Sequence, residues 1–347
     1  MSRAHAARNE VDGPEGGSTT VEQMLGSWEP APGAARELRR LHAAALNTHV
    51  ARALAAADDN PQSAQRLQEL AEQLRTSSWT TPEVAFTQYA ILAKGRTPTG
   101  EQHSLVLDSL SAIAAGPAPA TAVGGRTSMP EWAPYAMRLF EDDQVREQRQ
   151  VRWELVLQDE IAERECRAAL ELLADAWPAM AGVVEAYVRE ILWYTCGDVP
   201  ASRSLCVAQA FGAVFLHRRA DRIEAAEHLA HEATHFELIA RMAIDPLIEN
   251  GDAPARSPFR AEPRPLGRVL HACLVSARLT AVLERLQLVL PASDLPTVQR
   301  RRATAYDDFA VAMSSLKATA QWTPRGQRLF ESMQELLARG PGDVAPS

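Results

Sequence analysis

The chain has 347 residues, enough for one large domain or for two of ordinary size. Hydrophobic residues make up 46% and charged residues 23%, which is typical of a globular protein and excludes a fully disordered chain. The formal charge of −8 offers no basic field to a phosphate backbone, and no apolar run approaches the ~20 residues of a membrane span. We therefore expect neither nucleic acid nor a membrane as a partner. The first residues lack the apolar core of a secretory signal and the four cysteines are scattered, which predicts reduced thiols and a cytoplasmic location.

Helical patterns dominate the first part of the chain. Residues 1–28 are predicted as a flexible tail, because the segment opens on a polar stretch rich in Gly and charge. Residues 29–145 form a predicted N-terminal helical region, which is a candidate for binding a peptide. Its helices are expected at residues 32–59 and from residues 61, 81 and 100 onward, with a loop at 116–128.

The second part, residues 146–340, is predicted as a metal-binding catalytic domain, and a flexible tail at 341–347 follows it. A long helix over 145–177 is interrupted at Pro178, and helical character resumes to about residue 193, before a turn at 196–200. Residues 202–216, rich in Val and Phe, favour a strand or hairpin. Further helices are expected at 221–248, 266–289, 294–318 and 323–339, with a loop at 251–265. The predicted fold class is mainly α, of the α+β kind, with a small β element that includes part of residues 203–217 beside a metal-binding helix.

One short motif carries most of the chemical information. His231-Glu232-Ala233-Thr234-His235 is an HExxH sequence within a predicted helix. Residues four apart on a helix lie only about 40° apart around its axis, so both imidazoles face the same way and can share one metal ion. Glu232 flanks that face and is placed to act as a base on a metal-bound water. The motif predicts a metal centre with Glu232 as its catalytic residue.

Two histidines rarely hold a catalytic metal alone, so we expect a third protein ligand. Glu249 and Glu262 are the carboxylates at a spacing similar to that of thermolysin-like enzymes. His271, in the apolar predicted helix at 266–289, is the stronger candidate. An HExxHxxGxxH site is excluded, because the chain has Leu238 and Arg241 at the last two motif positions.

Two further charged residues are candidates near this centre. Glu227 lies one turn before His231 and is either an acceptor that orients this histidine or part of a solvated face. Arg278 lies seven residues after His271, hence on its face, and either clamps a carboxylate or forms a structural ion pair.

Three runs of sequence resemble the HExxH-motif proteins encoded beside ribosomal-peptide precursors. They are Phe211-Gly-Ala-Val-Phe-Leu216, the segment from Ala226 to His235, and Pro263-Arg-Pro-Leu-Gly267 with the following Leu270-His271. The resemblance is specific over residues 205–280. It implies an iron(II) and 2-oxoglutarate dependent enzyme that hydroxylates a side chain, at the β-carbon, of a precursor peptide. It also implies that His231, His235 and His271 bind the metal with Glu232 beside it, and that Arg278, Arg264 or Arg268 binds 2-oxoglutarate.

Three functions remain open from the sequence. The first is the peptide hydroxylase with iron(II) and 2-oxoglutarate. The second is a zinc metallopeptidase in which Glu232 is the general base. The third is a helical module that captures a precursor peptide without catalysis, which bound metal would exclude.

Overall fold

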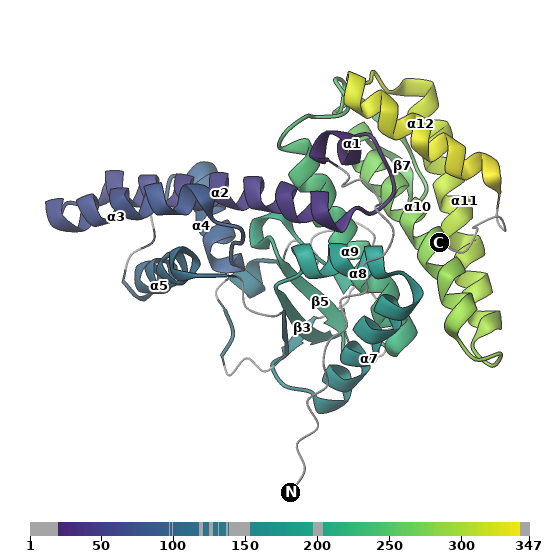
Figure 1. Cartoon of the computed structure of the whole chain (residues 1–347), viewed down its shortest axis with the longest axis horizontal. Helices are drawn as coiled ribbons and strands as arrows, with labels where there is room; N and C mark the ends of the chain where they lie inside the picture. The colour runs from purple at the N-terminus through teal and green to yellow at the C-terminus, as the bar shows by residue number, and fades with distance from the viewer. Residues whose placement is uncertain are drawn as a thin grey trace, which may run out of the picture.

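A computed structural model describes residues 20–340, apart from residues 97, 99, 118–120, 125–127, 131, 137, 139–152 and 197–203. The fold is mainly helical with a small sheet, which confirms the predicted class (Figure 1). The helices described are α1 (Val21–Leu25), α2 (Pro32–Ala57), α3 (Pro61–Gln73), α4 (Pro82–Lys94), α5 (Glu101–Ala115), α7 (Glu160–Ala176), α8 (Pro178–Tyr187), α9 (Arg222–Met242), α10 (Leu266–Val289), α11 (Leu295–Thr319) and α12 (Pro324–Arg339).

Local capping chemistry explains where several helices begin. The Asn60 side chain accepts hydrogen bonds from two backbone N–H groups at the start of α3, and Pro61 occupies the first helical position. Thr81 caps α4 in the same way, with Pro82 after it. The bounds of α10 coincide with the predicted 266–289. Sequence signals that act within one turn therefore predicted these boundaries well.

A mixed sheet lies beside α8 and α9. Its central strand β3 (Glu190–Thr195) runs parallel to β5 (Ala213–His217) and to the short β1 (Ala122–Val123), and pairs antiparallel with β2 (Glu154–Val156). Strand β4 (Ser204–Leu205) pairs antiparallel with β5 at the end of the strand order. The predicted β element within residues 203–217 is thus confirmed, and it leads directly into α9.

Four predictions of local structure were wrong. The helix expected over 145–177 begins only at Glu160 and β2 precedes it, while residues 145–152 lie outside the described part. Helical character does not continue to residue 193, because β3 begins at Glu190. The expected loop at 251–265 is a hairpin of β6 (Pro254–Ser257) and β7 (Arg260–Pro265). In addition, α9 ends at Met242 rather than near 248, and all but the first residue of the expected turn at 196–200 lies outside the described residues.

The end of the predicted N-terminal tail is part of the folded body. Residues 21–25 form α1, and the Trp28 side chain is only 3% exposed. The Trp28 backbone N–H donates to Ser332 Oγ on α12 at 2.9 Å. The prediction of a flexible tail is therefore wrong for residues 21–28. Residues 1–19 and 341–347 lie outside the described residues.

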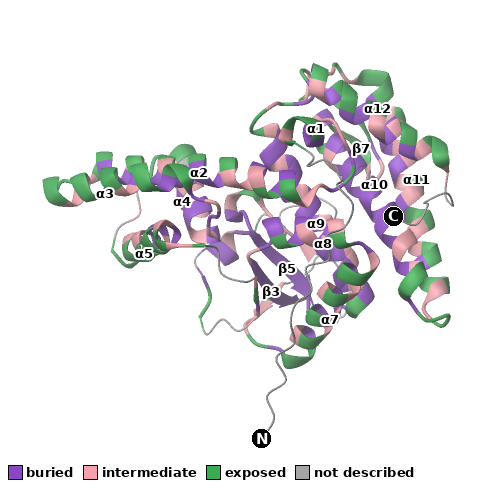
Figure 2. Cartoon of the chain, in the orientation of Figure 1, coloured by how far each residue is buried: buried purple, intermediate pink, exposed green. Residues whose placement is uncertain are grey.

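One continuous apolar core joins both parts of the chain. It includes side chains from α1 through α12, and α2 packs against α8 and α9. Strand β1 belongs to the predicted N-terminal region, yet it pairs with β3 of the second part. The boundary expected at 145/146 is thus no break in the sheet or the core. Figure 2 shows the sheet, α9 and α10 as the most buried elements, while the far end of α2 with α3 projects as an exposed arm.

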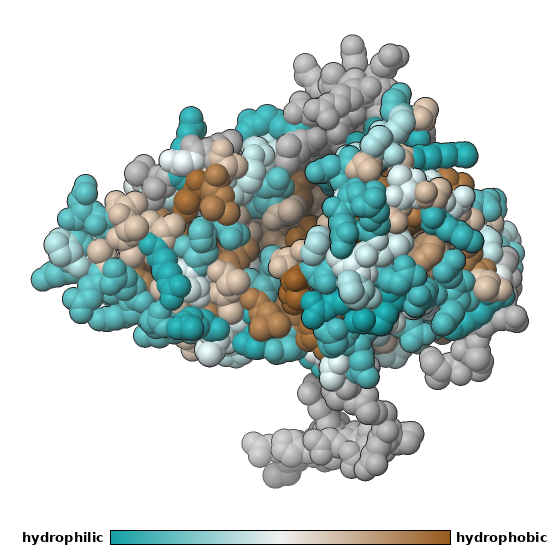
Figure 3. Space-filling model, turned by 90° about the horizontal axis from the view of Figure 1, so that it is seen from above, coloured by the Kyte–Doolittle hydropathy of each residue, from teal (hydrophilic) through white to brown (hydrophobic). Residues whose placement is uncertain are grey.

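Helix α10 is long and apolar enough to cross a membrane by length and composition alone. However, 83% of its most apolar window is buried inside the protein, as in the core helix of a soluble protein. The surface in Figure 3 is largely hydrophilic, with apolar residues in small groups. Burial against α9 and α11 accounts for the apolar composition of α10.

Candidate metal centre

Helix α9 places the HExxH motif in the middle of a packed scaffold. The Asp221 side chain caps the helix by accepting hydrogen bonds from Ile223 N and Glu224 N. The helix then packs against α7, α8 and α10 and presents its motif turn toward β4. Its position is therefore held on several sides, which is what a precise metal site requires.

The two motif histidines have the spacing of two ligands of one ion. His231 Nε2 and His235 Nε2 are 3.1 Å apart. Nitrogens at this separation and about 2.1 Å from an ion subtend an angle of about 95° at it, suitable for neighbouring ligands. The His231 side chain is 29% exposed, so this side of the pair is accessible to solvent and to a substrate.

His271 contacts the same cluster, but from the other side of His235. Its Nδ1 lies 3.0 Å from Nδ1 of His235, the ring nitrogen that points away from His231. The two nitrogens of an imidazole diverge, so this contact does not join His271 to the two Nε2 atoms of α9, and the metal-ligand group found among the described residues does not include His271. The structure thus brings all three histidines together without surrounding one point with them. A hydrogen bond at Nδ1 is the contact that fixes the tautomer of a metal-binding histidine.

Glu232 completes the group with metal-ligand geometry. Within the described residues, this group consists of His231, Glu232 and His235, whose ligand atoms lie within 4.8 Å of one another. The Glu232 side chain is 3% exposed, and its Oε1 lies 3.9 Å from His231 Nε2. Ser204 Oγ donates a hydrogen bond of 2.5 Å to the same oxygen. Ser204 is a residue of the site that the sequence did not single out, because no motif links it to a helix 28 residues away.

Burial keeps two histidines of the site, His235 and His271, neutral near pH 7. Burial lowers the pKa of His235 well below its ordinary value, and the nearby His231, His271 and Arg268 lower it further. Burial, together with the charge of Arg268, lowers the pKa of His271 to about 4. Neutral imidazoles have the free lone pair that metal binding needs, so these ligands require no deprotonation near neutral pH.

Arg278 does not face the metal centre. It is fully buried and donates to both oxygens of Glu237, at 2.9 and 2.8 Å, and from Nε to the Trp28 carbonyl at 3.0 Å. Arg241 also pairs with Glu237 and donates to the Ser27 carbonyl at 2.7 Å. Because its guanidinium is bound to an internal carboxylate, the role expected for Arg278 in binding 2-oxoglutarate is corrected to a structural ion pair.

Other predicted acidic residues also lie elsewhere. Glu227 does not orient His231, since it pairs with Arg301 of α11 at 2.5 Å, and Glu224 pairs with the same arginine at 3.0 Å. Glu249 is exposed beyond the end of α9, and Glu262 is exposed on β7. Neither belongs to the metal-ligand group found among the described residues.

Arg268 is a cation beside the centre. It is exposed in the first turn of α10, one turn before His271 on the same face. Its charge reaches His235, His271 and Cys206. No ion pair is recorded for its guanidinium among residues 20–340 as described. Arg268 therefore remains available to an anionic ligand, whereas Arg278 does not.

The comparison with known proteins adds no relative. The chain matches no protein-family model and no curated protein. The site must therefore be interpreted from its own geometry.

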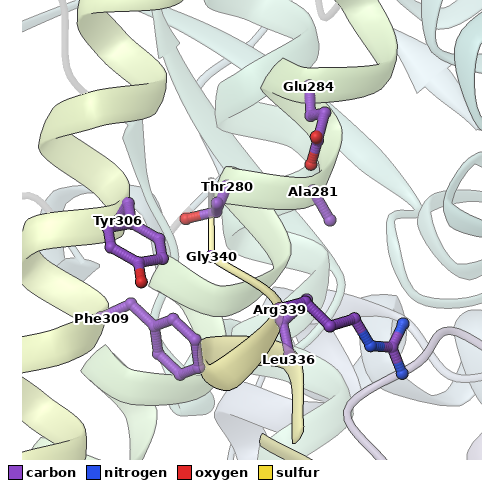
Figure 4. A pocket seen from close by; sticks show the side chains of 8 residues that line it. All are labelled: Thr280, Ala281, Glu284, Tyr306, Phe309, Leu336, Arg339 and Gly340. Carbon is purple, nitrogen blue, oxygen red and sulfur yellow. The ribbon is translucent and has the colours of Figure 1, made fainter. Parts of the chain in front are cut away.

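A cavity on the other side of α10 is too small for a substrate. It measures about 10 Å³ and is lined by residues of α10, α11 and α12, including Thr280, Glu284, Tyr306, Phe309 and Arg339 (Figure 4). Such a volume accommodates at most one water molecule. No residue of the metal centre lines it, so it is a packing defect between helices.

Proposed function

We propose that the chain is a metal-dependent enzyme that modifies a ribosomally synthesised precursor peptide in the cytoplasm, by hydroxylating a side chain at the β-carbon with iron(II) and 2-oxoglutarate. The observation that carries the proposal is the pair of Nε2 atoms 3.1 Å apart on a buried, capped helix, with Glu232 beside them. The type of peptide rests on the sequence resemblance over residues 205–280.

Two of the three expected ligands suit the proposed metal. His231 and His235 would hold iron(II), which imidazole ligands bind well, and the partial exposure of His231 leaves access to open positions. When bound, the ion and 2-oxoglutarate would activate dioxygen, of which one oxygen atom would enter the peptide and the other the succinate left when 2-oxoglutarate loses carbon dioxide. The chain's own part is to keep His235 neutral by burial, to fix it through His271, and to keep Glu232 oriented beside the ion.

A carboxylate of 2-oxoglutarate needs a cation. Arg268 supports this part of the proposal, because its exposed guanidinium lies near His235 and His271. A guanidinium binds a carboxylate in a bidentate manner, which suits a dicarboxylate co-substrate. With Arg278 paired to Glu237, Arg268 takes its place as the candidate.

Strand β4 supports a peptide as substrate. It is the last strand in the order β1-β3-β5-β4, and its residue Ser204 contacts Glu232. An extended peptide can add to such a strand through main-chain hydrogen bonds, which would bring its side chains past the metal helix. We do not expect nucleic acid as a partner, given the net charge of −8.

The second candidate is a zinc metallopeptidase. The position of Glu232 favours it, since a buried carboxylate 3.9 Å from His231 Nε2 is well placed to accept a proton from a metal-bound water. In that reaction, Glu232→Gln keeps the shape but removes the base, and hydrolysis should fall about 10²–10⁴-fold.

The test uses the whole chain with candidate precursor peptides, taken from short reading frames beside its gene. With iron(II) and 2-oxoglutarate, mass spectrometry should show a gain of one oxygen atom that depends on 2-oxoglutarate. Cleavage with zinc and without 2-oxoglutarate, lost in Glu232→Gln, would replace the proposal with the peptidase. A purified protein that binds no metal would refute both and leave the peptide-capturing module.

A further inference from the structure

Glu232 is a buried carboxylate whose orientation depends on another element of the fold. Only 3% of its side chain is exposed, and its recorded hydrogen bond comes from Ser204 Oγ at 2.5 Å. A glutamate side chain has three rotatable bonds, and a buried charge needs hydrogen bonds to offset its desolvation. The contact with Ser204 therefore selects one conformation of Glu232 from several.

The sheet fixes Ser204 relative to α9. Ser204 pairs with Leu216 of β5, and the chain passes from β5 into α9 within a few residues. Just after β4, Cys206 Sγ lies 4.0 Å from the Glu232 carbonyl oxygen, so the segment 204–206 contacts this residue of the helix twice. Main-chain hydrogen bonds hold β4 in the sheet, so the Ser204 side chain is not needed for strand pairing. Its hydroxyl therefore donates to the Glu232 carboxylate.

The oxygen that Ser204 holds lies close to one of the metal-binding atoms. Oε1 accepts the hydrogen bond and also lies 3.9 Å from His231 Nε2. We propose that Ser204 is a positioning residue, which holds the Glu232 carboxylate toward the metal-binding face of α9. The inference rests on the proposed metal-dependent function, but it applies to hydroxylation and to peptide hydrolysis alike.

The first test measures turnover of the precursor peptide. Ser204→Ala should lower kcat about 10–100-fold with little change in KM or metal content, the range found when contacts around a metal site are removed. Ser204→Thr restores a hydroxyl and should recover most of kcat. Ser315→Ala is the matched control, because this half-buried hydroxyl donates only to the Val311 carbonyl within α11. In a Glu232→Gln background, Ser204→Ala should have no further effect, as expected for two residues that act as a unit.

The second test needs no turnover. Cobalt(II) is added to the whole protein, and its visible absorption spectrum is recorded for the wild type, Ser204→Ala, Glu232→Gln and the double variant. The two single variants should shift the spectrum alike, and the double variant should equal Glu232→Gln. An unshifted Ser204→Ala spectrum beside a shifted Glu232→Gln spectrum would overturn the role of Ser204 alone. Failure of the wild type to bind cobalt(II) would instead overturn the metal centre and every inference that rests on it. Equal melting temperatures of wild type and Ser204→Ala exclude a folding defect as the cause of any shift.

Discussion

Replacing Glu237 should reveal how strongly the buried ion group supports the metal helix. Glu237 lies on α9, two residues after His235, and neither it nor its partners Arg241 and Arg278 is exposed to solvent. The two arginines also donate to the carbonyl groups of residues 27 and 28, so the group connects α9, α10 and the segment after α1. Glu237→Gln removes the only negative charge of the triad and leaves two buried guanidiniums.

Two lines of reasoning give a similar magnitude. Breaking a buried ion pair by removing one partner typically costs about 3–5 kcal/mol, because the remaining charge is uncompensated. Burial alone would raise the pKa of Glu237, but the charges and hydrogen bonds of Arg278 and Arg241 outweigh it and lower the pKa to about 2. Compared with an ordinary value of 4.5, this shift corresponds to about 3 kcal/mol of stability. Burial also lowers the pKa of Arg241, which shows that the intact triad carries a desolvation cost. The large loss of stability is therefore expected when the carboxylate is removed and the two guanidiniums remain buried.

The assay is urea unfolding followed by circular dichroism. We expect Glu237→Gln to lower the free energy of unfolding by about 3 kcal/mol or more at pH 7. The native pKa is depressed, so the stabilisation is fully present above pH 4.5 and is lost as the pH falls toward 2, and the two proteins should converge there. Glu37→Gln is the control, since this exposed partner of Arg40 should contribute at most about 1 kcal/mol. A change below 1 kcal/mol in Glu237→Gln would refute the reasoning.

Three further predictions follow from the contacts. His271→Ala should still bind one metal ion, but about 10–100-fold more weakly in a chelator competition. Alanine at either motif histidine of α9 should instead remove the metal. Complete loss of metal in His271→Ala would show that His271 is a direct ligand. Burial lowers the pKa of His42 to about 4, so protonation of this histidine favours the unfolded state. Between pH 6.5 and 4 the free energy of unfolding of the wild type should fall by up to about 3 kcal/mol, and that of His42→Phe should not show this loss. Parallel profiles of stability against pH would contradict this. A Cβ at Gly326 would lie 1.8 Å from the Leu247 carbonyl oxygen, so Gly326→Ala should lower the melting temperature through a loss of about 1–3 kcal/mol, whereas Gly33→Ala, with open space around it, should not.

The sequence by itself determined the elements whose signals are local. Pro61, the pair Thr81-Pro82 and the apolar pattern of α10 predicted where these helices begin, because capping and amphipathic burial act within a few residues. The HExxH spacing likewise placed His231 and His235 on one face of a helix, since the 3.6-residue period alone brings them together.

Only the tertiary structure decided what depends on distant partners. Strand β3 was mistaken for a continuation of helix because only two residues separate it from the end of α8, although Ile191, Trp193 and Tyr194 favour a strand. Its neighbours β1, β2 and β5 come from three separate segments, so its pairing could not be seen in the local sequence. The face of Arg278 was predicted from helix spacing, but which carboxylate it meets depends on how α10 packs on α9, and that packing supplies Glu237. The same packing sets which nitrogen of His235 contacts His271, and the sheet brings Ser204 to Glu232. The helix period determines which residues share one face of a helix. Which residues of another element pack against that face depends on the burial of the whole apolar core.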